Sequence, residues 1–251
     1  DGAGNNLTIH STGSTIFSGN NHTNLNELAI TADESNIRGL VSTSGNQSYA
    51  VEKFRISENL TLLSGAGNIN IGSAQNEAEL NANPKSGGFN LAIGDANQTG
   101  DVAIYGYGIE GGGPDPSFDP DRGLGPIQIG EGSFNVAIQT SKALDIDSGD
   151  FLNNGTVALT TGTDASSYIR FKDGINASAD VTLDGTIRSD SSQNYSGNVS
   201  LAGDTSLSGT TASFANGLEG GGNNLSLNMN GSTNLNAGLN NVSDFSSTGD
   251  V

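Results

Sequence analysis

The amino-acid sequence predicts an all-β protein built as a parallel β-helix, or β-solenoid, of about ten coils. Short runs in which apolar and polar residues alternate recur along nearly the whole chain, and they indicate strands of about five residues. Pairs such as Gly-Asn, Ser-Gly and Asp-Gly separate these runs and are typical of tight corners. Segments also recur far apart in the chain, as they do in proteins made of stacked repeats.

The clearest recurrence is a strand, a polar corner and an aromatic residue. The segment Val41–Tyr49 aligns with Ile187–Tyr195, with a glutamine and a tyrosine at matching places (Gln47 with Gln193, Tyr49 with Tyr195). A second recurrence, Gly-Asn-Asn-Leu followed by Gly-Ser-Thr, starts at Gly4 and again at Gly222. Such imperfect, widely separated repeats favour coils that bury a core against their neighbours.

Three strands and three corners would take roughly 20–25 residues per coil, which gives about ten or eleven coils and a length of about 50 Å at ~4.8 Å per coil. Asparagine is abundant at the corners, which predicts ladders of side-chain amides between successive coils. Repeated β-sandwiches are the alternative fold, because short strands with regular turn signals also suit them. Helical periodicity is confined to residues 74–80, a segment too short to predict a helix.

We expect residues 1–251 to form one continuous solenoid section of a larger protein, because both ends fall inside repeat-like sequence. The segment at about 105–126 breaks the pattern, since it holds four of the five prolines and many glycines. Proline removes a ladder donor and glycine weakens a strand, so we expect an inserted loop at a corner. Long loops on rigid scaffolds often carry function. Residues 81–88 form a smaller candidate of the same kind.

Composition excludes several functions. The net charge is −18, and the nine lysines and arginines are spread singly, which argues against nucleic-acid binding. The absence of cysteine excludes disulfides and thiolate chemistry, and no apolar run is long enough to span a bilayer. His10 and His22 are the only neutral-pH bases, and neither has the neighbours of a catalytic triad. We therefore predict no enzyme, no catalytic residues and no organic cofactor.

Acidic clusters are the best candidates for metal ligands. Asp115, Asp119 and Asp121 share the proline-rich segment, and their hard oxygen atoms would suit calcium. Their spacing matches neither an EF-hand nor the glycine-rich nonapeptide repeat, so a solvated acidic loop is the other interpretation. Asp145 and Asp147 alternate with apolar residues, and we expect them to line the outer face of a strand.

The opening Gly-Asn-Asn-Leu-Thr-Ile, the Gly-Asn-Gln-Ser-Tyr corner and the following Leu-Thr-Leu-Leu-Ser-Gly run resemble the repeats of bacterial β-strand-repeat exoproteins. These are the filamentous-haemagglutinin-like and autotransporter-like adhesins, and the resemblance is clearest over residues 4–72 and 181–251. It implies a right-handed parallel β-helix, export to the outer cell surface or beyond under a signal peptide that this sequence does not include, and a role as an extended fibre or adhesin. The family has no shared catalytic residues.

Our leading hypothesis is a structural and adhesive segment of a long bacterial cell-surface or secreted fibre protein. Its expected partners are other copies or neighbouring segments of the fibre and host or cell-surface glycans or proteins, without nucleic acid or a membrane span. One alternative is a polysaccharide-binding or polysaccharide-degrading β-helix of the tailspike or lyase kind. Another is a subunit that polymerises end to end into a surface filament, since uncapped coils expose unpaired edges.

Overall fold

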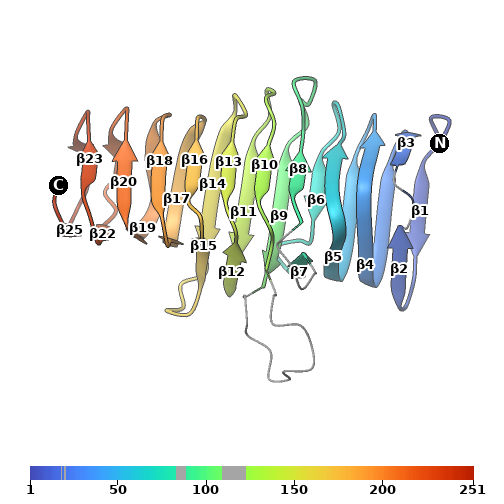
Figure 1. Ribbon diagram of the computed structural model, residues 1–251, viewed down its shortest axis with the longest axis horizontal. Coiled ribbons are helices and arrows are strands. Elements are labelled where there is room, and N and C mark those ends of the chain that lie inside the picture. The colour runs from blue at the N-terminus through green and yellow to red at the C-terminus, as the bar shows by residue number, and fades with distance from the viewer. Residues whose placement is uncertain (18, 20, 83–88, 109–122) are drawn as a thin grey trace.

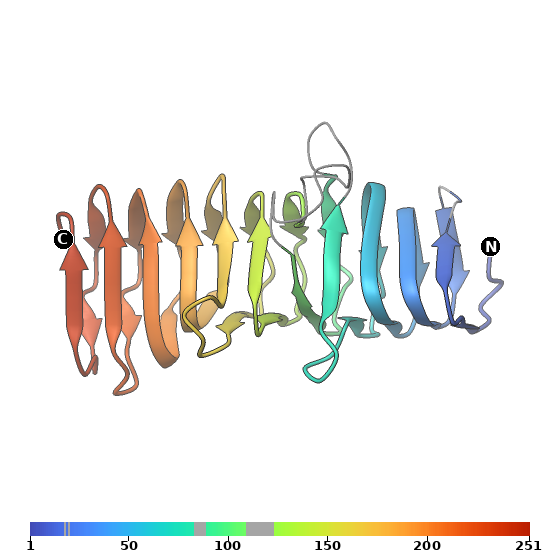
Figure 2. The same ribbon diagram turned by 90° about the horizontal axis from the view of Figure 1, so that it is seen from below.

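The computed structural model of the protein describes residues 1–17, 19, 21–82, 89–108 and 123–251, and these residues form 25 strands and no helix. The strands wind into an elongated stack with the N-terminus at one end and the C-terminus at the other (Figures 1 and 2). Every pairing between these strands is parallel, whereas the sheets of a β-sandwich are antiparallel. The predicted β-solenoid is therefore confirmed, and the β-sandwich alternative is wrong.

Three rows of parallel strands, which we call faces 1, 2 and 3, follow one another along each full coil; the last coil has strands of faces 1 and 2 only. Face 1 consists of β1 (Leu7–His10), the starts of β4 (Leu28–Thr43) and β5 (Gln47–Leu63), β6 (Ile69–Ile71), β9 (Val102–Tyr107), β11 (Val136–Thr140), β14 (Thr156–Thr161), the starts of β17 (Asp180–Ser189) and β19 (Val199–Gly209), β21 (Leu218–Glu219) and β24 (Leu239–Asn240). We number the coils from 1 to 11 by these strands, so that coil 8 begins at β17.

The other two faces complete each coil. Face 2 consists of β2 (Ser14–Phe17), the middle of β4 and β5, β7 (Ala78–Ala82), the end of β9, β12 (Ala143–Ile146), β15 (Tyr168–Phe171), the ends of β17 and β19, β22 (Leu225–Met229) and β25 (Phe245–Thr248). Face 3 consists of β3 (Asn21–Leu25), the ends of β4 and β5, β8 (Leu91–Ile93), β10 (Ile127–Ile129), β13 (Gly149–Phe151), β16 (Ile175–Ala177), β18 (Ser192–Tyr195), β20 (Thr211–Phe214) and β23 (Thr233–Leu235).

Coil length varies along the stack. Val157 pairs with Val181 and Val181 with Val199, which are separations of 24 and 18 residues. Val102 pairs with Val136, a separation of 34 residues that contains the segment predicted to be an insertion. The predicted length of roughly 20–25 residues therefore fits some of the plain coils, whereas others are shorter, down to 18 residues. The segment with helical periodicity ends in β7, a strand of face 2.

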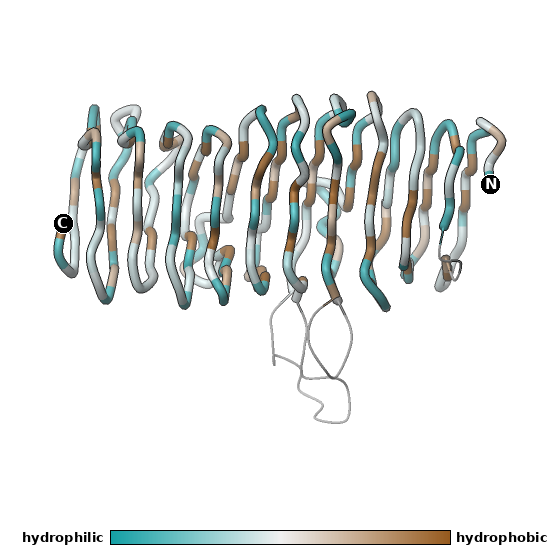
Figure 3. The backbone as a smooth tube through the Cα atoms, turned by 45° about the horizontal axis from the view of Figure 1, so that its top comes forward, coloured by the Kyte–Doolittle hydropathy of each residue, from teal (hydrophilic) through white to brown (hydrophobic). Residues whose placement is uncertain are grey.

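The core is a set of apolar rows that run along the axis inside the three faces. Figure 3 shows hydrophobic patches along the strands and hydrophilic residues at many of the turns. One row on face 1 keeps perfect register through nine coils: Ile9, Ile30, Tyr49, Ile71, Ile104, Ile138, Leu159, Leu183 and Leu201. From Ile30 onwards these side chains are buried. Each coil therefore buries its apolar residues against the coils on either side.

Buried glutamines close two of the corners from inside. The Gln47 side-chain amide donates to the backbone carbonyl of Leu63 at 2.7 Å, and its carbonyl accepts a 2.9 Å bond from the Tyr49 hydroxyl. Gln193 and Tyr195 repeat this pairing at 2.8 Å. Gln47 starts a face 1 strand, whereas Gln193 lies in a face 3 strand. The recurrence seen in the sequence is therefore a corner unit used at two different corners.

Asparagine and aspartate side chains link successive coils on the outside of the corner between faces 3 and 1. The side-chain oxygen of each ladder residue accepts from the backbone N–H of the next, at 2.9–3.0 Å, along the series Asn46, Asn68, Asp101, Asn135 and Thr156. These bonds satisfy backbone donors that would otherwise face water at the corner. The predicted side-chain ladder is confirmed, with aspartate and threonine taking places beside asparagine.

Candidate functional site

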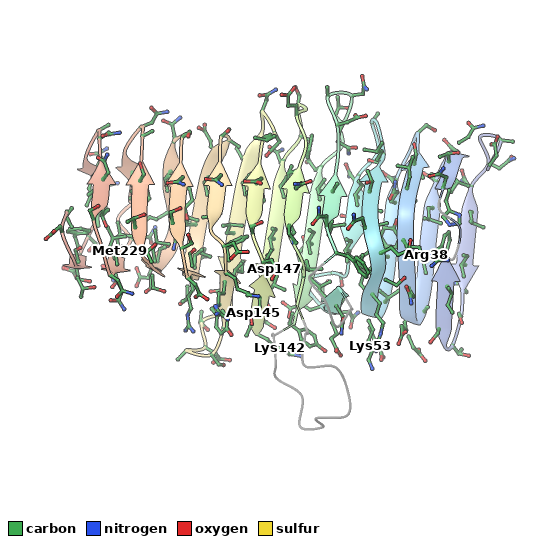
Figure 4. All side chains as sticks on the ribbon, viewed as in Figure 1. Arg38, Lys53, Lys142, Asp145, Asp147 and Met229 are labelled. Atoms are coloured by element: carbon green, nitrogen blue, oxygen red, sulfur yellow. The ribbon has the colours of Figure 1, made fainter. Side chains whose placement is uncertain are left out.

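Folding gathers the basic side chains on face 2. The described part of the chain holds seven lysines and arginines, and all lie in or directly beside face 2 strands: Arg38, Lys53, Arg55, Lys142, Arg170, Lys172 and Arg188. Figure 4 labels three of them, on coils 2, 3 and 6. Cations that stand singly in the sequence therefore share one face in three dimensions, because coils bring residues about 20 apart into adjacent positions.

Two tyrosines stand on the same outward row of face 2. Tyr107 precedes Gly108, which bridges to Leu144, so Tyr107 lies next to Ala143 in the row, and Ala143 pairs with Tyr168. Both rings are half-buried and each lies against a cation. The Lys142 ammonium is 3.6 Å from the Tyr107 ring centroid, and the Arg188 guanidinium carbon is 4.2 Å from that of Tyr168. Two cation–π pairs therefore lie on either side of Ala143 in this row.

The proline-rich segment starts and ends on face 2. Gly108 bridges to Leu144 and Leu124 bridges to Ile146, on either side of Asp145. The Asp145 N–H donates to the carbonyl of Gly108 at 2.7 Å, and the Asp145 carbonyl accepts from the N–H of Leu124 at 2.9 Å. One residue of coil 6 therefore holds both ends of the insertion. The described residues place these ends within face 2, whereas the sequence suggested a corner.

The predicted calcium ligands lie outside the described residues. Asp115, Asp119 and Asp121 all fall between Gly108 and Gly123, so the calcium prediction stays a prediction. In the part of the chain that the structure describes, no group of three or more histidine, aspartate or glutamate side chains is arranged to hold a metal ion.

Asp145 is the buried centre of the face 2 cluster. Its side chain is only 5% exposed, and its carboxylate lies 3.7 Å from the Arg170 guanidinium. It lies on the outer side of its strand, as the alternation predicts, but Tyr168, Arg170 and the returning end of the insertion cover it. A Cβ atom on Gly123 would lie 3.4 Å from the Cβ of Asp145. Burial and then the charge of Asp145 raise the pKa of the Tyr168 phenol.

Arg170 joins Asp145 to the next coil. Its guanidinium binds the Asp190 carboxylate through two nitrogens, and the Nε–Oδ1 distance is 3.0 Å. This hydrogen bonding lowers the pKa of the Asp190 carboxyl and raises that of the Arg170 guanidinium. Asp147 sits beside the pair and binds Lys172 at 3.2 Å. The cluster therefore connects coils 6, 7 and 8 through charged side chains.

Ion pairs balance the charge on face 2. Arg38 binds Glu58 at 2.7 Å and Arg55 binds Glu34 at 3.2 Å, so the first coils repeat the arrangement of coils 6 to 8. The corner between faces 3 and 1 carries acidic residues such as Asp101 and Asp180, and its described residues include no lysine or arginine. The circumference thus has an acidic corner and one face with cations, tyrosines and the insertion.

The two histidines stand apart from this cluster. His22 packs its ring edge-on against Phe17, with 4.7 Å between the ring centroids. His10 ends β1 at the N-terminal end of the stack. The arrangement on face 2 combines paired charges, aromatic rings and hydroxyl groups, which are the chemical groups that binding surfaces use.

No protein-family model matches the chain, and no curated protein sequence or solved structure is similar to it at a significant level. No helix in the described part of the chain is long and apolar enough to cross a membrane.

Proposed function

We propose that this chain is a structural and adhesive segment of a long cell-surface or secreted bacterial fibre protein, without catalytic activity, and that face 2 is its contact surface. The observation that carries the proposal is that the three faces of one solenoid carry different side chains. Two faces and their corners repeat simple ladders, while one face collects the cations, the two tyrosines that lie against cations, and the insertion.

The stacking of the coils supports the structural half of the proposal. Core rows and corner ladders continue from coil to coil in register, so each coil is a template for the next. A rod built this way resists bending and can be lengthened without changing its cross-section. Both properties suit the shaft of a fibre.

The chemistry of face 2 supports the adhesive half. Its tyrosines and arginines are the residue types that dominate binding energy at protein surfaces. Its ion pairs and the backbone bonds to Asp145 hold these side chains and the two ends of the insertion in place before any partner arrives. Preorganised groups lose less entropy on binding than mobile ones do.

Two measurements test the halves separately. Electron microscopy of the intact native protein, with this section located along it, should show the section embedded in a long thin shaft. A compact particle would contradict the structural half. For adhesion, purified solenoid is tested for binding to target cells, and Lys142→Gln combined with Arg188→Gln should reduce the binding several-fold.

The matched control changes the net charge equally on another face. Gln128 and Asn234 lie on the outward row of face 3, so Gln128→Glu with Asn234→Asp also adds two negative charges. Equal loss of binding in both double variants would mean that overall charge, and not face 2, governs adhesion.

A further inference from the structure

A groove lies at the edge of face 2, along the corner between faces 1 and 2 in coils 7 to 11. This corner is long in coil 7, where residues 162–167 separate β14 from β15, and in coil 10, where residues 220–224 separate β21 from β22. In coil 8 it shrinks to Asp184 alone, whereas coil 9 has three residues in its place. The short corner between longer ones leaves a hollow of about 880 Å³.

Glycine at the base of this hollow keeps side chains out of it. Gly185 has φ +91°, and a Cβ atom there would lie 2.0 Å from the hydroxyl oxygen of Thr161. The position therefore accepts no side chain without moving the neighbouring coil. Gly162 and Gly203 also line the hollow, so a flat ligand can approach the backbone closely. Its volume falls in the range of ~300–1,000 Å³ that is usual for ligand sites.

The lining is polar in a repeating way. Successive coils each contribute an acidic or amide side chain and, two residues later, a hydroxyl: Asp184 and Thr186, Asp204 and Ser206, Asn224 and Ser226. Among the described residues, the side chains of Asp184, Thr186 and Ser206 have no hydrogen-bond partner. Asp204 is used, since it accepts two bonds from Asn224. The groove thus offers acceptors and hydroxyls that the fold itself does not need.

We propose that this groove binds a neutral glycan. Sugar hydroxyls both donate and accept, and a carboxylate is a strong acceptor for an O–H donor while serine and threonine hydroxyls can do either. Four aspartates line the groove, at positions 164, 184, 204 and 244, and no lysine, arginine or histidine does. Like charge therefore disfavours acidic sugars and nucleic acids.

Other ligands fit the groove less well. A metal ion is disfavoured because the described acidic side chains form no group arranged to hold one. A basic peptide would satisfy the carboxylates, but it would make little use of the free hydroxyls or of the glycine floor. The inference goes beyond the adhesive role of the face 2 cluster, because none of the cations or tyrosines of that cluster lines the groove. The groove would bind whether or not the chain belongs to a fibre.

The test is isothermal titration calorimetry of the purified chain with neutral hexasaccharides (cellohexaose, chitohexaose and maltohexaose), with hexagalacturonate and octalysine as charged probes. We expect one neutral hexasaccharide to bind in a 1:1 ratio and hexagalacturonate not to bind. Asp184→Asn should weaken binding roughly tenfold, because a hydrogen bond to a charged group is lost. Ser206→Arg should abolish it by filling the groove.

The matched control is Ser213→Arg. Ser213 lies in the same coil, on the outward row of face 3 and outside the groove. It should bind as the unchanged chain does, and thermal unfolding should show that both arginine variants fold. Binding of octalysine alone, binding of no neutral hexasaccharide, or equal binding by the two arginine variants would each overturn the proposal.

Discussion

The hydroxyl of Tyr49 donates a 2.9 Å hydrogen bond to the side-chain carbonyl of Gln47, and both side chains are fully buried. Through this bond the Tyr49 ring, which lies in the core, fixes the orientation of the Gln47 amide at the corner between faces 3 and 1. The amide in turn donates to Leu63 in the same coil, so one tyrosine connects the core with the turn of the chain.

Replacing this tyrosine tests the connection. Tyr49→Phe should lower the free energy of unfolding by about 1–3 kcal/mol, because the Gln47 carbonyl is left buried without its donor. Urea unfolding followed by circular dichroism measures the loss. Tyr105→Phe is the matched control, since Tyr105 is half-buried on the outside, and it should change stability by less than about 0.5 kcal/mol. Equal effects of the two changes would contradict a special role for the buried pair.

The same burial predicts a loss of stability in alkali. Burial raises the pKa of both Tyr49 and Tyr195 above the ordinary tyrosine value. The unfolded chain ionises these phenols from about pH 10, while the folded chain keeps them protonated. Their contribution is therefore complete below about pH 10 and falls above it, by up to ~1.4 kcal/mol per pH unit for each tyrosine.

Comparing unfolding at about pH 9 and about pH 11 measures this loss. The double change Tyr49→Phe with Tyr195→Phe should make the difference between the two conditions smaller. A difference that stays the same would mean that other groups cause the alkaline loss.

Local patterns in the sequence were enough to predict the coils. Alternation predicts strands, Gly-Asn and Ser-Gly pairs predict corners, and asparagine at the corners predicts a ladder such as Asn46 to Asn68. Each of these is decided within a few residues or between like positions of adjacent coils. The matching glutamines could likewise be recognised as equivalent, although the corner that each occupies could not.

The position of side chains around the circumference needed the structure. Coil length changes from 24 to 18 residues between coils 7 and 8, so no fixed period maps a residue to its face. The gathering of cations on face 2 and the short corner at Asp184 both depend on these changes. Alternation correctly directed Asp145 outward, but it could not show that Tyr168 and the insertion cover it.

The corner ladder should contribute to stability coil by coil. The Asn135 carbonyl accepts from both the N–H and the hydroxyl of Thr156, at 3.0 Å each. Its amide also donates to the Asp101 carboxylate at 3.1 Å. Asn135→Ala should therefore cost about 1–2 kcal/mol in the free energy of unfolding, through the loss of these exposed hydrogen bonds.

Asn97→Ala is the matched control for the ladder. Asn97 is exposed at the same corner, and only its backbone N–H makes a hydrogen bond, to Asp95. Urea unfolding should show almost no change for it. If Asn97→Ala cost as much as Asn135→Ala, loss of asparagine at a corner would matter for another reason than the ladder.

The Asp145 cluster should be the most sensitive part of face 2. Arg170→Met removes the guanidinium beside a carboxylate that is only 5% exposed, so it should cost about 3–5 kcal/mol. Adding Asp145→Asn should restore much of this loss, because an amide is buried at lower cost than a charge. Arg38→Met is the matched control, since its partner Glu58 is 52% exposed and the pair should contribute less than about 1 kcal/mol. Unfolding in urea distinguishes the three variants. Two results would contradict this prediction: Arg170→Met losing no more stability than Arg38→Met, or Asp145→Asn restoring none of the loss. Either would mean that Arg170 does not stabilise the buried charge of Asp145. The backbone hydrogen bonds alone would then hold the ends of the insertion.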